Sequence, residues 1–138
     1  MVLFIMSKGN TSESAKIAVL LIIQRFSEER IFGGYEAQVF IRENLEKFTK
    51  GMLFKIKKFL LPTLIAISQY LEYEIFTKEV FSLFLQFTKD DIWGVRKVCV
   101  ELTMPILKLV KNDDFENIKE CVDFMEKSLN DSSRWVKN

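Results

Sequence analysis

The sequence predicts an all-α protein built as an α-α superhelix, in which helical hairpins stack on one another. No segment alternates apolar and polar residues over the length of a strand. The 138 residues include only 5 Gly and 2 Pro, too few for the turns of a β-rich fold. Two similar stretches, 90–97 and 131–138, recur about forty residues apart, a distance typical of helix-pair repeats. Such arrays usually present a surface rather than enclose an active site.

The first helix is predicted over about 12–29. Asn10 and Glu13 have the spacing of a capping box at its start. Apolar residues cover much of its circumference, so we expect neighbours on more than one side. Gly33 and Gly34 are predicted to end this helix.

Two further helices are predicted over about 35–49 and 52–70. Gly51 separates them at the position of a C′ glycine. Pro62 predicts a kink in the second, because proline removes one hydrogen bond of the helix ladder. The apolar face of the first consists of Val39, Leu45 and Phe48. That of the second has steps of three and four residues: Leu53, Ile56, Phe59, Leu60, Leu64 and Ile67.

The next two helices are predicted over about 73–88 and 92–110. Asp90 or Asp91 is predicted to cap the second of them, and Pro105 to bend it. The buried stripe of the first comprises Phe76, Val80, Leu83, Phe84 and Phe87. The buried stripe of the second comprises Ile92, Val95, Cys99, Leu102, Ile106 and Leu109.

A sixth helix is predicted over about 114–129, and Asp131 is predicted to cap a seventh that contains one turn. Asp113 and Glu116 form the capping pattern of the sixth. Because the seventh helix is short, the apolar stripe of the sixth is expected to lack part of its cover. The isolated chain is therefore predicted to be marginally stable or self-associating. The stripe consists of Phe115, Ile118, Val122, Met125 and Leu129.

Short connections favour antiparallel neighbours, so we expect these helices to pair. The expected pairs are 35–70, 73–111 and 114–138, the last of them truncated, with helix 12–29 left from a preceding pair. The whole chain, 1–138, is then expected to be one array of repeats. We expect it to be a fragment of a longer solenoid.

Composition excludes several classes of partner. The chain is 49% hydrophobic, which is enough for a core. Its net charge is +1, with 20 basic and 19 acidic residues, so neither nucleic acid nor a membrane surface is an expected partner. No apolar run approaches the roughly 20 residues that a bilayer span requires. A cytoplasmic or nuclear location is expected.

The sequence offers few groups for catalysis. It contains no histidine, no P-loop and no glycine-rich dinucleotide motif. We therefore predict no catalytic residue, no cofactor and no metal site, and expect a protein that is not an enzyme. Cys99 and Cys121 form no C-x-x-C pair and fall on apolar stripes, as buried thiols in a reducing compartment do.

The repeated stretch resembles a known family. The pattern of Asp90, Trp93, Val95 and Arg96 is similar to HEAT repeats in regulatory subunits of serine/threonine protein phosphatases, especially those of the protein phosphatase 4 type. The likeness covers about 72–138 and is only general before that. It implies an armadillo-like solenoid and a non-catalytic subunit that holds a phosphatase catalytic subunit and shapes its substrate choice. It gives structural roles to Asp90, Asp91, Trp93, Val95, Arg96, Asp131, Trp135, Val136 and Lys137.

The two tryptophans have two interpretations. Trp93 either packs into the joint between successive hairpins, which we favour, or anchors a partner. Trp135 differs from it in register by one residue, because Trp93 aligns with Arg134. Trp135 stays open between the two roles, because its predicted helix is incomplete.

Arg96 also has two interpretations. It either pairs with an aspartate at a repeat start, Asp131 or Asp90, or joins a basic ridge on the second helices. We favour the ion pair, which would tie neighbouring repeats together. The candidate partner surface is basic and comprises Lys55, Lys58 and Lys97, with Lys137 as a further member of the ridge.

Two classes of function remain from these patterns. The first is a regulatory scaffold that binds the catalytic subunit of a serine/threonine protein phosphatase. The second is a general HEAT-repeat adaptor for transport or assembly, unrelated to phosphatases. A small helical enzyme is a third, weaker interpretation, and it requires an enclosed polar pocket.

Overall fold

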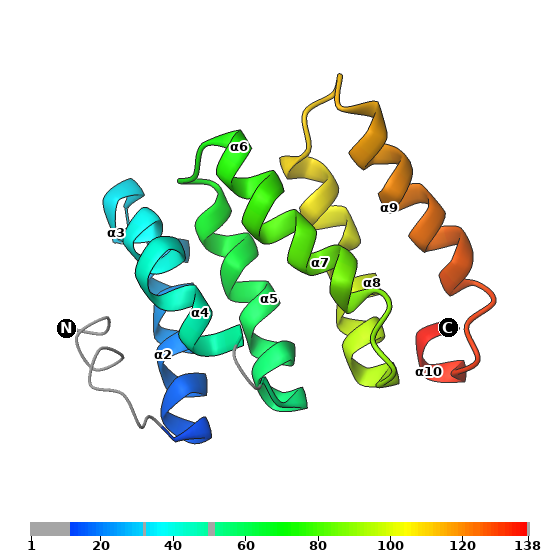
Figure 1. Cartoon of the computed structure of the whole chain (residues 1–138), viewed down its shortest axis with the longest axis horizontal. Helices are drawn as coiled ribbons and strands as arrows, with labels where there is room; N and C mark the ends of the chain where they lie inside the picture. The colour runs from blue at the N-terminus through cyan, green and yellow to red at the C-terminus, as the bar shows by residue number, and fades with distance from the viewer. Residues whose placement is uncertain (1–11, 32, 50–51, 138) are drawn as a thin grey trace. The chain divides into compact units, whose positions relative to one another are not determined.

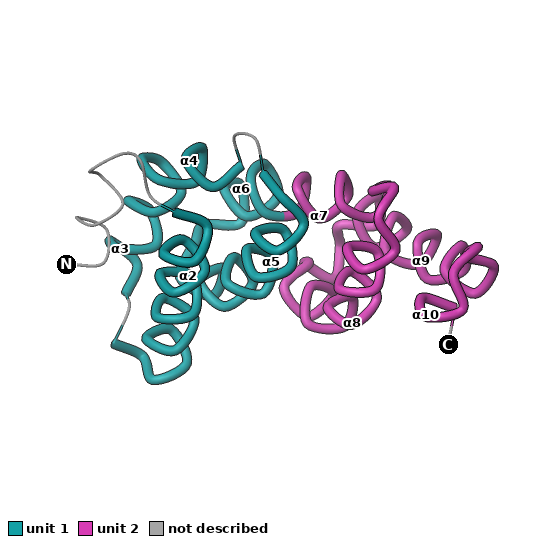
Figure 2. The backbone as a smooth tube through the Cα atoms, turned by 90° about the horizontal axis from the view of Figure 1, so that it is seen from below, with its two compact units in different colours: residues 1–80 teal, residues 81–138 magenta. Residues whose placement is uncertain are grey.

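The computed structural model describes residues 12–31, 33–49 and 52–137 (Figure 1). These residues form helices and contain no strand, which confirms the all-α class. The chain divides into two compact units, Met1–Val80 and Phe81–Asn138 (Figure 2). The predicted capping residue Asn10 and the predicted C′ glycine Gly51 lie outside the described residues.

The first helix that the structure describes is α2 (Glu13–Glu28), close to the predicted range. Ser12 is its N-cap, and the Ser12 hydroxyl accepts a hydrogen bond of 3.2 Å from the Ala15 N–H. This bond satisfies one of the donors that a helix start leaves unpaired.

The end of α2 differs from the prediction, because the helix stops before the two glycines. Arg30 adopts a left-handed conformation, with φ of 59°. The Ile31 N–H donates to the Phe26 carbonyl at 2.9 Å, and the Arg30 N–H donates to the Ser27 carbonyl at 3.2 Å. This pair of bonds is the Schellman motif, formed without glycine. Gly33 instead precedes the next helix, where its N–H donates to a Glu36 carboxylate oxygen.

The predicted helix 35–49 is a continuous helical stretch with a wide turn in its middle. It consists of α3 (Gly34–Val39), the π-helical segment η1 (Phe40–Asn44) and α4 (Leu45–Thr49). The rings of Phe40 and Phe48 lie 5.4 Å apart. Side chains on both sides of the π turn therefore share one core. The buried apolar residues of this stretch are Ala37, Phe40, Leu45 and Phe48.

The second long helix of this unit, α5 (Phe54–Ser68), packs against α2 (Figure 1). The Thr63 hydroxyl lies 3.1 Å from the Leu20 carbonyl of α2, and the Tyr70 hydroxyl donates to the Ser27 carbonyl at 3.1 Å. The first contact joins the two helices, and the second joins the turn after α5 to α2. The helix runs continuously through Pro62.

One residue of the predicted α5 stripe is not buried. Leu53 is 60% exposed, because it is the N-cap and precedes the first helical turn. The four buried members of the stripe are Ile56, Leu60, Leu64 and Ile67, and Phe59 is half-buried.

The next helical stretch crosses the division between the units at Val80. It consists of α6 (Tyr73–Ile75), the π-helical segment η2 (Phe76–Phe81) and α7 (Ser82–Phe87). Its predicted stripe is confirmed, since every member is buried: Phe76, Val80, Leu83, Phe84 and Phe87.

The second unit continues with α8 (Trp93–Leu109), α9 (Phe115–Ser128) and α10 (Arg134–Lys137). α8 is central, because it packs against α7, α9 and α10. It runs continuously through Pro105. Ile92 was predicted to be buried but is 43% exposed, since it is the N-cap and lies outside the helix. The buried residues of α8 are Val95, Val98, Cys99, Thr103 and Ile106.

The face that α9 turns inward differs from its predicted stripe. Cys121, Phe124 and Ser128 are the buried residues of this helix. The predicted stripe lies beside them and is largely exposed, as expected for a stripe that lacks cover. The exposed fractions are 74% for Phe115, 46% for Val122, 39% for Met125 and 64% for Leu129.

None of the helices that the structure describes has both the length and the hydrophobicity needed to cross a bilayer.

Candidate interaction surface

The repeated aspartates make the same local turn in front of two helices. The Asp90 carboxylate accepts from the Ile92 N–H at 2.9 Å, and the Asp131 carboxylate accepts from the Ser133 N–H at 2.8 Å. The first turn leads into α8 and the second into α10. The sequence repeat between 90–97 and 131–138 is therefore also a repeat of backbone structure.

Three predicted helix caps are wrong by one or two residues. α8 has Ile92 as its N-cap, because the Asp90 carboxylate is engaged in the turn before it. In front of α10, Asp131 is likewise engaged with the turn, while the Ser133 hydroxyl accepts from the Trp135 N–H at 3.3 Å. α9 is capped by Asp114, one residue after the predicted Asp113.

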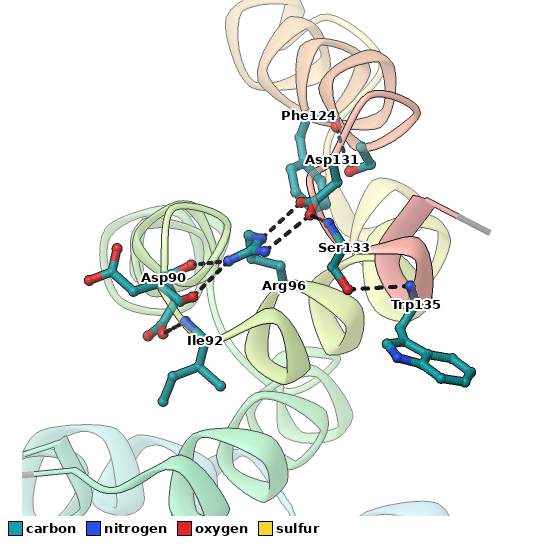
Figure 3. Close-up of polar contacts among 9 residues, drawn as sticks. Asp90, Ile92, Arg96, Phe124, Asp131, Ser133 and Trp135 are labelled. Atoms are coloured by element: carbon teal, nitrogen blue, oxygen red, sulfur yellow. Dashed lines mark hydrogen bonds and ion pairs between the residues drawn. The ribbon is translucent and has the colours of Figure 1, made fainter.

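Arg96 joins these two turns (Figure 3). Its guanidinium donates two parallel hydrogen bonds to the Asp131 carboxylate, at 2.8 and 3.0 Å. A third nitrogen donates to the carbonyls of Asp90 and Asp91, at 2.7 and 3.0 Å. The predicted pairing of Arg96 with Asp131 is present, whereas Asp90 contributes its backbone carbonyl. We call this arrangement the Arg96 clamp: Asp90, Asp91, Arg96 and Asp131.

The clamp is shielded enough from water to be energetically significant. The side chains of Arg96 and Asp131 are only 16% and 12% exposed. The hydrogen bonds from Arg96 hold the pKa of Asp131 below its ordinary value, and the same bonds raise the pKa of Arg96. Bidentate pairs of this kind fix geometry as well as charge.

The lowered pKa of Asp131 predicts a specific acid sensitivity. The folded carboxylate binds protons less readily than the unfolded one, so its stabilising contribution is complete above the ordinary aspartate pKa. The contribution is lost as the pH falls through the lower, folded pKa. Urea denaturation across the acid range should therefore show a steeper loss of stability for the wild-type chain than for Asp131→Asn. Parallel curves for the two proteins would contradict this prediction.

The two tryptophans form one exposed aromatic patch on the second unit. The rings of Trp93 and Trp135 stack at 6.2 Å with an interplanar angle of 28°. The Arg134 guanidinium lies 4.7 Å from the centre of the Trp135 ring. Trp93 remains 45% exposed and Trp135 53% exposed. Trp93 thus contacts Trp135 of the next predicted helix pair and keeps almost half of its surface exposed.

An apolar groove lies between α8 and α9 of the same unit. Its volume is about 240 Å³. Met104 on α8 and Leu129 after α9 are 57% and 64% exposed. Among the described residues, the groove is lined by Glu126, which is charged, and by Thr103, Met104, Leu107, Cys121, Val122, Met125 and Leu129. An α9 stripe that lacks part of its cover was predicted from the sequence, but the α8 wall was not.

The candidate basic surface is distributed over both units. Lys55 and Lys58 are exposed and lie one turn apart on α5 of the first unit. Lys97 is half-buried on α8 of the second unit, and Lys137 is exposed on α10. Arg96 does not contribute to the basic ridge, because its guanidinium is engaged in the clamp.

A second cavity of about 370 Å³ lies in the first unit and was not anticipated from the sequence. It is lined by residues of both helical stretches that contain π turns: Gln38, Ile41, Arg42, Ile75, Lys78 and Glu79. Wide turns of this kind leave no simple periodic signal in a sequence, so the cavity could be found only in the structure.

The two cysteines are buried and free of disulfides. Burial raises the pKa of Cys99 to about 12, with a smaller contribution from Asp90, and raises that of Cys121 to about 11. Both thiols are thus protonated and unreactive near neutral pH. Among the described residues, no group of three or more His, Cys, Asp or Glu side chains is placed to hold a metal ion.

No known protein family, curated protein or solved structure shows significant similarity to this chain.

Proposed function

We propose that the chain is a HEAT-type array and a non-catalytic regulatory scaffold that binds the catalytic subunit of a serine/threonine protein phosphatase and directs its activity. One observation carries this proposal. The Asp90 and Asp131 turns are equivalent in sequence and in hydrogen bonding, and the Arg96 clamp joins one to the other. A clamp between equivalent points of consecutive repeats suits a surface whose geometry must be preserved.

Helix packing supports the array within each unit. In the proposed pairing, α2 and α5 are the second helices of consecutive pairs, and they pack together. The same relation holds for α8 and α10 in the other unit. Contact between corresponding helices of neighbouring repeats is how a solenoid buries a continuous core.

The phosphatase part of the proposal depends on the family resemblance of the motif. Each motif residue has a defined place in the structure. Asp90 forms the turn, Trp93 stacks on Trp135, Val95 is 1% exposed and Arg96 forms the clamp. The proposed partner is a catalytic subunit of the protein phosphatase 4 type, met in the cytoplasm or nucleus.

A general HEAT adaptor is the second candidate, since the same fold and the same exposed tryptophans suit other protein partners. Affinity purification of the tagged chain followed by mass spectrometry separates the two. A phosphatase catalytic subunit among the specific partners is the expected result. Recovery of transport or assembly factors without any phosphatase would support the general adaptor instead.

Charge reversal tests the basic part of the surface. We expect Lys55→Glu/Lys58→Glu to reduce recovery of the phosphatase subunit, because a favourable charge at the contact is replaced by a repulsive one. The thermal midpoint should change little, since both side chains are exposed. Lys78→Glu/Lys127→Glu is the matched control, with two exposed lysines on other helices. If both variants and the wild type recover equal amounts of the phosphatase subunit, Lys55 and Lys58 do not belong to the partner-binding surface.

A further inference from the structure

The exposed stripe of α9 has the spacing of a coiled-coil seam. Its members alternate steps of three and four residues, as the a and d positions of a heptad do: Phe115, Ile118, Val122, Met125 and Leu129. The neighbouring face of the helix is already used, because Cys121, Phe124 and Ser128 are buried. The seam is therefore a largely exposed apolar surface beside the packed face of the helix, with Ile118 half-buried.

The seam is self-complementary in an antiparallel pair, because a positions of one helix then pack against d positions of the other. With a two-fold axis between Val122 and Met125, Val122 of each copy packs against Met125 of the other. Ile118 of each copy then packs against Leu129 of the other. A self-complementary arrangement of this kind is what an isologous dimer requires.

The charged residues that flank the seam are complementary in the same arrangement. Lys119 and Glu126 each follow a d-type residue and occupy equivalent e positions. In an antiparallel pair these positions face each other, so Lys119 of one copy meets Glu126 of the other, and the pair occurs twice. Within one chain Lys119 contacts Asp123 at 2.7 Å, but these side chains are 75% and 53% exposed. Lys119 can therefore exchange Asp123 for Glu126 of the second copy at a small cost in free energy.

The apolar groove enlarges the apolar surface that the seam offers to a second copy. It lies between the seam and α8, and Val122, Met125 and Leu129 belong to both. In the dimer, the apolar groove of about 240 Å³ therefore lies beside the seam of α9 and can accept side chains of the second copy. From the spacing, the symmetry and the flanking charges, we infer that α9 forms an antiparallel homodimer with α9 of a second copy of this chain. The inference is independent of the phosphatase proposal.

Sedimentation velocity over a range of concentrations tests this dimer. The wild-type chain should show a reversible monomer–dimer equilibrium. Val122→Lys should raise the dissociation constant by about tenfold or more, because it places a lysine in the apolar layer on each side of the two-fold axis. Tyr35→Lys is the matched control, since Tyr35 is a 76% exposed apolar residue on the first unit, and it should leave the equilibrium unchanged.

Charge exchange tests the antiparallel orientation. Lys119→Glu and Glu126→Lys should each weaken the dimer by a few-fold, because each creates two like-charged pairs. The double variant Lys119→Glu/Glu126→Lys should restore the wild-type dissociation constant. Circular dichroism of each variant confirms that it is folded. Failure of the double variant to recover would overturn the antiparallel arrangement.

Other outcomes would reject the dimer as a whole. A wild-type chain that stays monomeric at the highest soluble concentration overturns the inference. A dimer that survives Val122→Lys uses another face. A monomeric chain that loses a cellular partner on Val122→Lys shows that a different protein occupies the seam.

Discussion

Replacement of Phe84 by alanine is expected to lower the free energy of unfolding by about 3–5 kcal/mol. Phe84 has no exposed surface. Its ring lies 5.8 Å from Phe81 and meets Phe124 edge-on at 5.8 Å, with an interplanar angle of 86°. The substitution therefore removes a contact between α7 and α9 and leaves a cavity in the core of the second unit. Urea denaturation followed by circular dichroism measures the loss.

The control for this prediction is Phe115→Ala. Phe115 is 74% exposed, so in the monomer the same chemical change should cost less than about 1 kcal/mol. Similar unfolding midpoints for Phe84→Ala and the wild type would show that Phe84 is not a core residue. A large effect of Phe115→Ala would show that α9 packs by its outer stripe in solution.

Loss of the Arg96 clamp is expected to have the second largest effect. Arg96→Ala should destabilise the chain by about 2–3 kcal/mol, because it leaves a shielded Asp131 carboxylate and two backbone carbonyls without their donor. Arg96→Lys should recover only part of this loss, since lysine keeps the charge but cannot donate in a bidentate manner. The free energies are measured by urea denaturation at neutral pH.

A matched arginine elsewhere in the chain provides the control. Arg25 pairs with Glu29 at 2.9 Å, but the two side chains are 70% and 47% exposed. Arg25→Ala should therefore cost less than about 1 kcal/mol. If Arg25→Ala and Arg96→Ala proved equally mild, the clamp would be an ordinary surface ion pair and not a tie between repeats.

The positions of the helices were predictable because the steps of three and four apolar residues are long and regular. Their ends were less predictable. Arg30 ends α2 in a left-handed conformation that no pattern in the sequence predicts. Gly33 and Gly34, which follow it, lie outside α2. The sequence predicts helix caps at Asp90 or Asp91 and at Asp131, yet the Asp90 and Asp131 carboxylates each accept from an N–H two residues later. An aspartate near a helix start can either cap the helix or accept a hydrogen bond in the turn before it, so the local sequence does not decide between these two roles.

The candidate surface was predicted in part. The pairing of Arg96 with Asp131 followed from the repeat, because an arginine in one repeat and an aspartate in the next are natural neighbours. The stacking of Trp93 on Trp135 was not evident, since the two residues differ in register by one position. The inward face of α9 was also missed, because Cys121, Phe124 and Ser128 are less regular than the exposed stripe beside them.

The central claim is that this chain works by binding a phosphatase catalytic subunit. Isothermal titration calorimetry between the purified full chain and a purified catalytic subunit of the protein phosphatase 4 type tests it most directly. We expect saturable binding that is weakened by Lys55→Glu/Lys58→Glu and retained by Lys78→Glu/Lys127→Glu. Absence of binding, by a chain that circular dichroism shows to be helical and folded, would contradict it.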